Sequence, residues 1–240
     1  MEISLDLTFI SGILEEECET ARAEIRSAGV VRAYERSQLR HDARICSAPD
    51  AATLACRAGC TWCCYFSVDV RAVEVFRILD FVERELSEQE RARIFAEVRT
   101  NSAALRDLDE IERMRRNVKC PFLSEGRCTI YAARPQMCRN YHATSAIGCQ
   151  QSYEEPDNME IDPEFAPYVY QAGGAHVDAF STAMRDAGYD VEVYELNAAF
   201  DAALSDRAAR GRFESKRPPF TNLSGRDVPP EFDDIDFEST

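Results

Sequence analysis

The sequence has no apolar run near the ~18 residues that a membrane-spanning helix requires. Even residues 68–82, an apolar stretch, contain five charged side chains. The first residues lack a basic segment, and Glu15, Glu16 and Glu17 occupy the place where a secretory signal would have its apolar core. We therefore expect a soluble protein that is not exported and lies in the cytoplasm.

Basic residues are too few for a protein that binds nucleic acid. Lys and Arg total 28 against 43 Asp and Glu, a net charge of -15. Nucleic acids and anionic membranes attract proteins through Lys and Arg, so we expect neither as a partner. The compact basic run at Arg113, Arg115, Arg116 and Lys119 is interpreted as a solvated helix end, with a binding surface for an acidic partner or for the chain's own acidic tail as the alternative. The partner class that the sequence leaves open is a protein partner or substrate.

Recognisable cofactor motifs are missing as well. The ten glycines form no dinucleotide fingerprint and no phosphate-binding loop, and the chain has no internal repeat. No catalytic residue is therefore identified. A chain of 240 residues with 45% hydrophobic content buries one sizeable core, which predicts one main domain.

Apolar periodicity favours helices. Apolar residues three to five positions apart over the first 45 residues predict one long amphipathic helix. Ser67 is expected to cap a helix over residues 68–86, and Ser87 with Glu90 forms a capping box for another helix that runs toward Arg116. The fold class is therefore mostly α.

The second half contains two further predicted helices and two acidic segments. Asp162 followed by Pro163 is typical of a helix start, with Gly188 at the end of that helix, and residues 191–210 suggest another. Residues 154–164 and 227–240 each contain six acids and no base, which indicates an acidic loop and a loose tail.

A loop-rich stretch interrupts this helical pattern between residues 117 and 148, where proline, glycine and cysteine occur without a sustained period. We predict a helical domain built around a cysteine-ligated metal centre. The predicted organisation is an N-terminal amphipathic helix packed on the core (1–49), the cysteine-cluster region (50–150), C-terminal helices of the same domain (151–211) and an acidic, flexible tail (212–240).

Cysteine is the most informative residue type. Ten cysteines in a reducing compartment favour metal binding or redox chemistry over structural disulfides. Cys18 and Cys46 lie in helical sequence and are interpreted as ordinary small hydrophobic residues. The other eight form two groups, the first at Cys56, Cys60, Cys63 and Cys64 and the second at Cys120, Cys128, Cys138 and Cys149.

The spacing of the first group limits how one metal could be bound. Along a continuous helix, Cys56 and Cys64 would lie roughly 12 Å apart, whereas two sulfurs on one zinc lie roughly 4 Å apart. Either the helix breaks at Gly59 or the ligands divide between metals. Because neighbouring side chains diverge, adjacent Cys63 and Cys64 favour two nearby metals or one polynuclear centre.

Other side chains near the cysteines are candidates for supporting roles. Arginines are expected to donate hydrogen bonds to sulfur, and aromatic residues to exclude solvent, although buried aromatics are more often simply core. The candidates are Arg57, Arg127, Arg134, Arg139, Trp62, Phe122 and Tyr131. His142, four residues after Cys138, is left out of the ligand set because a lone histidine is more often a packing residue.

The cysteines and the residues around the second group resemble the YkgJ-type cysteine cluster family, CxxCxxCC, described as a zinc- or iron-chelating domain. The resemblance covers roughly residues 50–150 and rests on these positions in order: Cys56, Cys60, Cys63-Cys64, Cys120-Pro121-Phe122-Leu123, Gly126, Cys128, Ile130-Tyr131, Arg134-Pro135, Cys138-Arg139 and Tyr141. It implies zinc or iron as the cofactor. The ligand set that it implies is Cys56, Cys60, Cys63, Cys64, Cys120, Cys128, Cys138 and Cys149.

The resemblance leaves the metal and any reaction open. The preferred interpretation is a metal-binding protein in which zinc or iron is structural or carried. One alternative is an iron-sulfur enzyme that modifies a protein side chain, since similar cysteine motifs occur in flagellin lysine methylases. Another is a thiol-based redox or metal sensor.

Overall fold

The computed structural model describes residues 4–229 and 231–232. This part of the chain contains ten α-helices, three 3-10 helices and four strands of two or three residues, so the predicted mostly α fold class is confirmed. The α-helices are α1 (Leu7–Ala28), α2 (Val30–Ser47), α3 (Ala72–Glu85), α4 (Glu88–Leu105), α5 (Glu110–Met114), α6 (Gln136–Asn140), α7 (Ala146–Glu154), α8 (Pro167–Asp186), α9 (Leu196–Ser205) and α10 (Ala209–Glu214).

The strands and 3-10 helices are short connecting elements. Strand β1 (Asp69–Arg71) pairs antiparallel with β4 (Val193–Glu195), and β2 (Leu123–Ser124) forms a hairpin with β3 (Arg127–Cys128). The 3-10 helices are η1 (Ala51–Thr53), η2 (Trp62–Tyr65) and η3 (Tyr131–Ala133). The strands thus tie together segments that are otherwise helical or irregular.

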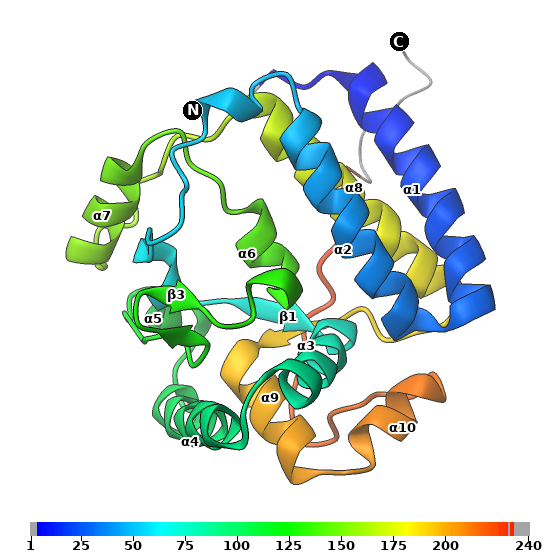
Figure 1. Cartoon of the computed structure of the whole chain (residues 1–240), viewed down its shortest axis with the longest axis vertical. Helices are drawn as coiled ribbons and strands as arrows, with labels where there is room; N and C mark the ends of the chain where they lie inside the picture. Colours follow the sequence, from blue (N-terminus) through cyan, green and yellow to red (C-terminus); the bar gives the residue numbers. More distant parts are fainter. Residues whose placement is uncertain (1–3, 230, 233–240) are drawn as a thin grey trace.

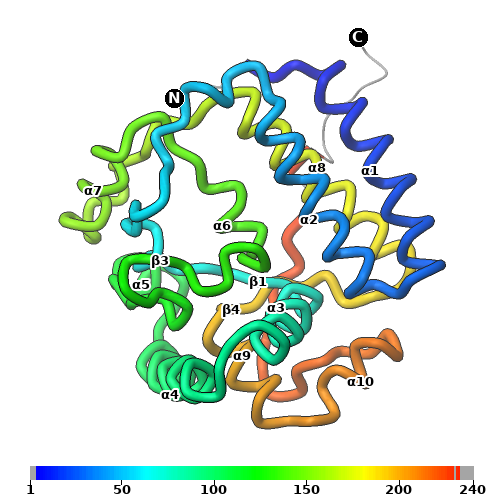
Figure 2. The backbone as a smooth tube through the Cα atoms, viewed as in Figure 1, coloured from blue at the N-terminus to red at the C-terminus, as the bar shows by residue number. Residues whose placement is uncertain are grey.

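Two groups of helices flank the β1–β4 ribbon (Figures 1 and 2). Helices α1, α2 and α8 pack side by side as a bundle, and α3, α4, α9 and α10 lie on the other side of the ribbon. Helix α6 lies between the bundle and β1, and α7 lies at the far edge of the molecule from α1. The cysteine-rich region occupies the side of the molecule where α7, β3 and α5 lie.

The single long helix predicted over the first 45 residues is two helices. Gly29 separates α1 from α2 with a φ of 82°, a left-handed conformation that glycine adopts without steric cost. The chain reverses there, and α2 packs back against α1. The apolar spacing was compatible with one helix because both helices bury a stripe of the same period.

The predicted boundaries of α3 and α4 had mixed outcomes. Ser67 does not cap a helix, because residues 69–71 pair with β4 and α3 begins only at Ala72. Ser87 does cap α4, accepting the Glu90 N–H at 3.2 Å, as predicted. Helix α4 ends at Leu105, and α5 is a separate short helix instead of a continuation toward Arg116.

Helix α8 begins at Pro167, later than the Asp162-Pro163 start predicted from the sequence. Its first N–H groups, those of Tyr168 and Val169, donate to the carboxylate of Asp50 at 2.8 and 3.0 Å. The cap therefore comes from a distant part of the chain. The predicted end holds, since Gly188 has a φ of 81° just after the helix. Residues 191–210 form β4, α9 and the start of α10 instead of one helix.

The cysteine-rich region shares the main hydrophobic core with the helices. Phe122, Ile130 and Ala133 are buried in that core, and the Phe122 ring lies 5.3 Å from the ring of Phe200 in α9. Burying a phenylalanine contributes about 1.5–3 kcal/mol. The region around β2 and β3 is therefore anchored by apolar packing.

The described part of the predicted flexible tail is packed on the protein. Phe213 and Phe220 are buried in the main core, and Phe232 is buried in a second cluster with Ile10 and Ile13. The Phe232 N–H donates to Asp178 at 3.0 Å. The remainder of that prediction, residues 230 and 233–240, lies outside the described residues.

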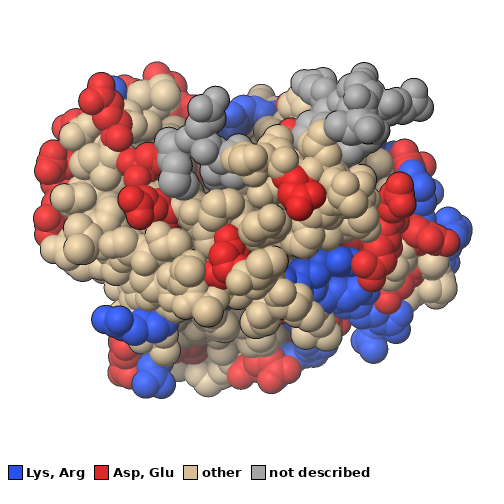
Figure 3. Space-filling model, turned by 90° about the horizontal axis from the view of Figure 1, so that it is seen from above, with Lys and Arg blue, Asp and Glu red and all other residues tan. Residues whose placement is uncertain are grey.

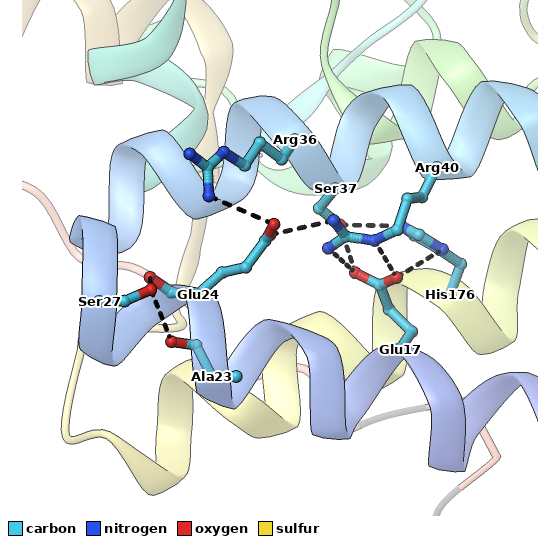
Figure 4. A network of polar contacts seen from close by, with 8 residues as sticks. All are labelled: Glu17, Ala23, Glu24, Ser27, Arg36, Ser37, Arg40 and His176. Atoms are coloured by element: carbon cyan, nitrogen blue, oxygen red, sulfur yellow. Dashed lines mark hydrogen bonds and ion pairs between the residues drawn. The ribbon is translucent and has the colours of Figure 1, made fainter.

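A buried polar network crosses the bundle of α1, α2 and α8 (Figure 4). The carboxylate of Glu17 accepts from Ser37 at 2.8 Å and from two nitrogens of Arg40 at 2.7 and 2.8 Å. Ser37 Oγ also lies 2.8 Å from His176 Nε2. Burial holds the pKa of His176 well below its usual value, so this imidazole is neutral at neutral pH. One carboxylate thus ties all three helices together.

The surface mixes charges of both signs. On the face shown in Figure 3, acidic and basic side chains are interspersed between uncharged areas, and neither sign covers the face.

None of the helices within residues 4–229 and 231–232 is long and apolar enough to cross a membrane.

The bundle network predicts a large cost for removing its carboxylate. Glu17→Ala leaves Ser37 and Arg40 without their shared acceptor, and the free energy of unfolding should fall by about 3 kcal/mol or more. Urea denaturation measures this value. Glu19→Ala, on the exposed face of the same helix, should change it by less than about 0.5 kcal/mol, and an equal effect of the two substitutions would contradict the network's role.

Asp178 predicts a pH-dependent stability. Burial raises the pKa of its carboxyl from 3.8 to about 6, so the folded state holds a proton that the unfolded state releases. The contribution of this group to the free energy of unfolding therefore falls as the pH rises from 3.8 to about 6. Asp178→Asn keeps an oxygen that can accept the Phe232 N–H and should be about 1–3 kcal/mol more stable than the parent protein at pH 7.5.

The gain from Asp178→Asn should shrink toward pH 4.5, because the parent carboxyl becomes protonated there in the folded state. Urea denaturation at the two pH values measures the change. A gain that does not depend on pH would contradict the assignment.

Candidate metal centre

The first cysteine group lies in an irregular segment instead of a helix. Cys56 follows η1 in extended chain, and Cys60 lies in a turn closed by its N–H to the Arg57 carbonyl at 3.0 Å. Gly59 in this turn has a φ of 90°, so the chain breaks where the cysteine spacing allowed a break. Cys63 and Cys64 then lie together in η2.

The second group lies on four different local structures. Cys120 precedes the β2–β3 hairpin, Cys128 is on β3 opposite Leu123, Cys138 is in α6 and Cys149 is in α7. Glu125 and Gly126 turn the hairpin with φ values of 49° and 72°. Cys149 is buried, Cys120, Cys128 and Cys138 are half-buried, and all ten cysteines of the chain are free thiols.

Backbone hydrogen bonds bring the two groups together. The Cys120 N–H donates to the Cys64 carbonyl at 2.8 Å, and the Val118 N–H donates to the Tyr65 carbonyl at 3.1 Å. On the other side, the Ala55 N–H donates to the Ala143 carbonyl at 2.9 Å. Helix α7 packs against η2, where Tyr153 contacts the rings of Trp62 and Tyr65 at 5.3 and 5.1 Å. In Figure 1 the segment after α2 runs beside α7 before it reaches β1.

Cys63 and Cys64 form a hydrogen-bonded thiol pair. This bond lowers the pKa of Cys63 to about 7 and raises the pKa of Cys64 far above its usual value. The negative charges of neighbouring thiolates, including those of Cys120 and Cys128, raise the pKa of Cys64 further. Cys64 is therefore within electrostatic reach of two cysteines of the second group.

A first neighbourhood of thiols consists of Cys63, Cys64, Cys120, Cys128 and Cys138. Burial raises the pKa of all three thiols, that of Cys120 to about 12, and the charge of Cys63 raises each of them further. Cys120 and Cys128 both act on Cys138 in the same way. Four thiols, those of Cys64, Cys120, Cys128 and Cys138, are thus gathered within electrostatic reach of Cys63.

Cys56, Cys60 and Cys149 form a second neighbourhood around Cys63. Burial raises the pKa of Cys149 to about 11, and the charges of Cys56, Cys63 and Cys60 add to this. Cys56 is exposed at the surface, and the partial desolvation of its thiol, with the charges of Cys60 and Cys63, raises its pKa. Tyr141, whose pKa is raised by burial and then by Cys149 and Cys63, lies at the same place. Cys63 is therefore shared by both neighbourhoods.

Helix α6, which carries Cys138, is held at both ends by buried polar contacts. At its start, the Gln136 N–H donates to Glu74 at 2.8 Å. At its end, Arg139 is 1% exposed and donates to Asp42 at 2.5 Å, and Asn140 Oδ1 lies 2.5 Å from His41 Nε2. The position of Cys138 therefore depends on α2 and α3 as well as on its own segment.

The predicted supporting arginines divide into two pairs. The positive charge of Arg134 lowers the pKa of Cys63, Cys128 and Cys138, and Arg139 acts on Cys128 as well. Arg57 and Arg127 are exposed. Arg134 lies 4.0 Å from the centre of the Tyr131 ring.

The predicted aromatic shell forms only at Trp62, which packs on Tyr153. Tyr131 is 63% exposed and Phe122 belongs to the main core. Tyr65, Tyr141 and Tyr153 lie around the thiols instead, and the sequence reasoning did not assign them to the site. The position of Tyr141 within the cysteine motif was the one available signal for them.

The residues left out of the ligand set are Cys18, Cys46 and His142. Cys18 packs on the main core, and Cys46 is exposed on α2. His142 is half-buried, and burial, with the charges of Arg134 and His41, lowers its pKa to about 4. Its Nδ1 is buried without a hydrogen-bond partner.

The donor set fits a soft or borderline cation by its chemistry. Thiols whose pKa is raised by burial and by one another hold their protons at neutral pH, and a bound metal would replace those protons. Within residues 4–229 and 231–232, however, no three His, Cys, Asp or Glu side chains are in position to hold a metal ion together. The thiols are neighbours in this structure and do not form a closed coordination sphere.

Comparison with known families agrees with the cysteine pattern. Residues 55–163 match the model of the family CxxCxxCC, which carries the description "Putative zinc- or iron-chelating domain". The matched segment includes all eight cysteines and extends through α7 beyond the predicted limit at residue 150. No curated protein and no solved structure matches the chain. The resemblance found in the sequence is thus confirmed over residues 55–163.

Proposed function

We propose that this protein binds zinc or iron through eight cysteines and that the metal is structural or carried. The observation that supports this most directly is the gathering of all eight thiols around η2 from two separate segments. Hydrophobic burial alone would not gather thiols in preference to other small residues. The family description of residues 55–163 points to the same two metals.

The eight thiols divide best into two adjoining sites. Cys64, Cys120, Cys128 and Cys138 would make one, because the Cys120 N–H bond to Cys64 and the charges that act on Cys138 join them. Cys56, Cys60, Cys63 and Cys149 would make the other, through the charges that act on Cys149. Adjacent Cys63 and Cys64, which share a hydrogen bond in this structure, would then each serve a different metal.

Binding would require the thiols of each site to close around the ion. Cys63 and Cys64 lie in a short 3-10 helix and Cys60 in a turn, and such short irregular elements adjust more readily than long helices. A bound metal would supply a strong cross-link between η2, the hairpin and α6 or α7. Because the unfolded chain has no such site, part of the free energy of metal binding would stabilise the folded state.

The ligand set predicts which substitutions lower the metal content. Cys128→Ser and Cys60→Ser each remove one ligand from a different proposed site, so each should lower the bound metal by roughly half. Both should also reduce resistance to urea. Elemental analysis of the purified variants measures the metal-to-protein ratio.

Cys18→Ser and Cys46→Ser are the matched controls, because these thiols lie outside the gathered group. Both controls should keep the parent metal content. Equal metal content in all four variants would rule out the proposed ligands.

An iron-sulfur enzyme is the second candidate, and a cavity favours it. A small cavity lined by Cys120 shares Leu105, Arg113 and Glu195 with a larger one of about 480 Å³. A substrate held in the larger cavity would lie beside the cysteine centre. Enzymes of this class need such a space, whereas a closed structural site does not.

The metal itself distinguishes the two candidates. Protein purified without oxygen would be analysed for zinc, iron and acid-labile sulfide, together with its visible absorption. Colourless protein with about two zinc ions per chain would support the structural or carrier function. Brown protein containing iron and sulfide would support the enzyme instead.

A further inference from the structure

A hollow region of the molecule lies between the end of α4, α9 and the segment at residues 219–226. Two cavities of about 480 and 530 Å³ adjoin there and share Ser102, Arg106, Ala198, Asn222 and Leu223 in their walls. Small-molecule sites typically have volumes of about 300–1,000 Å³. The first of these two, which we name the Arg113 cavity, is also the one that adjoins Cys120 through shared wall residues.

The carboxylates in the Arg113 cavity are already engaged by the protein. Asp69 and Glu110 both pair with Arg226, at 2.5 and 2.7 Å. Glu195 accepts the N–H groups of Asn197 and Ala198 at the start of α9, at 3.0 and 2.7 Å. The positive end of that helix offsets its charge. None of these acids is therefore left to pair with the other arginines of the cavity.

Two arginines of the same cavity lack such partners. No described carboxylate or carbonyl engages the guanidinium of Arg106 or Arg113, and Arg113 Nε is buried without a hydrogen-bond partner. A buried unpaired donor on a charged group is costly unless a ligand or water satisfies it. Leu105, Leu108 and Leu223 line the same space with apolar surface.

We propose that the Arg113 cavity binds a small organic anion, with Arg106 and Arg113 holding its phosphate or carboxylate group and the leucines contacting its apolar part. Guanidinium groups bind both anions through paired, charge-assisted hydrogen bonds. The amide of Asn222 and the hydroxyl of Ser224 are further donors in the wall. This site stands whether or not the cysteines bind metal, since none of its walls is a proposed ligand.

Calorimetric titration of the full-length protein with 1-naphthyl phosphate tests the proposal. The same titration with 1-naphthoate distinguishes phosphate from carboxylate, and 1-naphthylmethylamine supplies the same ring with a positive charge. We expect at least one of the two anions to bind more tightly than the amine. Raising the salt concentration should weaken the binding because an ion pair forms.

Arg106→Gln and Arg113→Gln should each weaken the binding of that anion roughly tenfold. Arg115→Gln removes the same charge two residues away, outside the cavity walls, and should leave the affinity unchanged. Arg106 is exposed, so its replacement does not disturb buried packing, and circular dichroism verifies the fold of each variant.

Three results would overturn the proposal: equal binding of anion and amine, no binding of either anion, or equal weakening by Arg115→Gln and Arg113→Gln. Metal content measured on the same variants separates this site from the cysteine centre. Lost anion binding with parent metal content supports an independent site, whereas anion binding that depends only on metal content contradicts it.

Discussion

The buried carboxylate of Glu74 joins the three parts of the molecule on which the cysteine centre depends. It accepts hydrogen bonds from the Tyr34 hydroxyl at 3.1 Å, the Arg71 N–H at 2.7 Å and the Gln136 N–H at 2.8 Å. These donors belong to α2, to the junction of β1 with α3, and to the start of α6. Each hydrogen bond to a charged group contributes roughly 1.5–3 kcal/mol, and a buried charge without its partners is costly.

This arrangement makes the cysteine region part of a larger domain. Cys138 is positioned by α6, whose two ends are held by Glu74 from α3 and by Asp42 and His41 from α2. Phe122 and Ile130 lie in the same core as the helices. The segment that matches the family model therefore owes part of its geometry to helices outside that segment, and the bundle of α1, α2 and α8 supports the centre mechanically.

The sequence revealed features that depend on local chemistry. The mostly helical class followed from apolar periodicity. The start of α4 followed from Ser87, whose side chain caps that helix. The chain reversal at Gly29 was missed because a glycine within an apolar period is compatible with either one helix or two. The start of α8 was missed because its cap is Asp50, more than a hundred residues away, and no local pattern reports such a partner.

The residue types of the candidate site could be predicted from the sequence, but their arrangement in space could not. Spacing identified the eight cysteines and the break at Gly59, whereas the grouping of Cys149 with Cys56 depends on α7 packing against η2. Tyr153 and Glu74 were missed because their contacts join segments far apart in the chain. Of the four arginines near cysteines, only packing distinguishes buried Arg139 from exposed Arg127.

X-ray absorption at the edge of the bound metal tests most directly the central claim, that the eight thiols are the ligands. The account predicts a first shell of sulfur alone, with four sulfurs at about 2.3 Å for zinc. A first shell in which nitrogen or oxygen predominates would contradict it, because such a metal would be bound by residues other than the gathered cysteines.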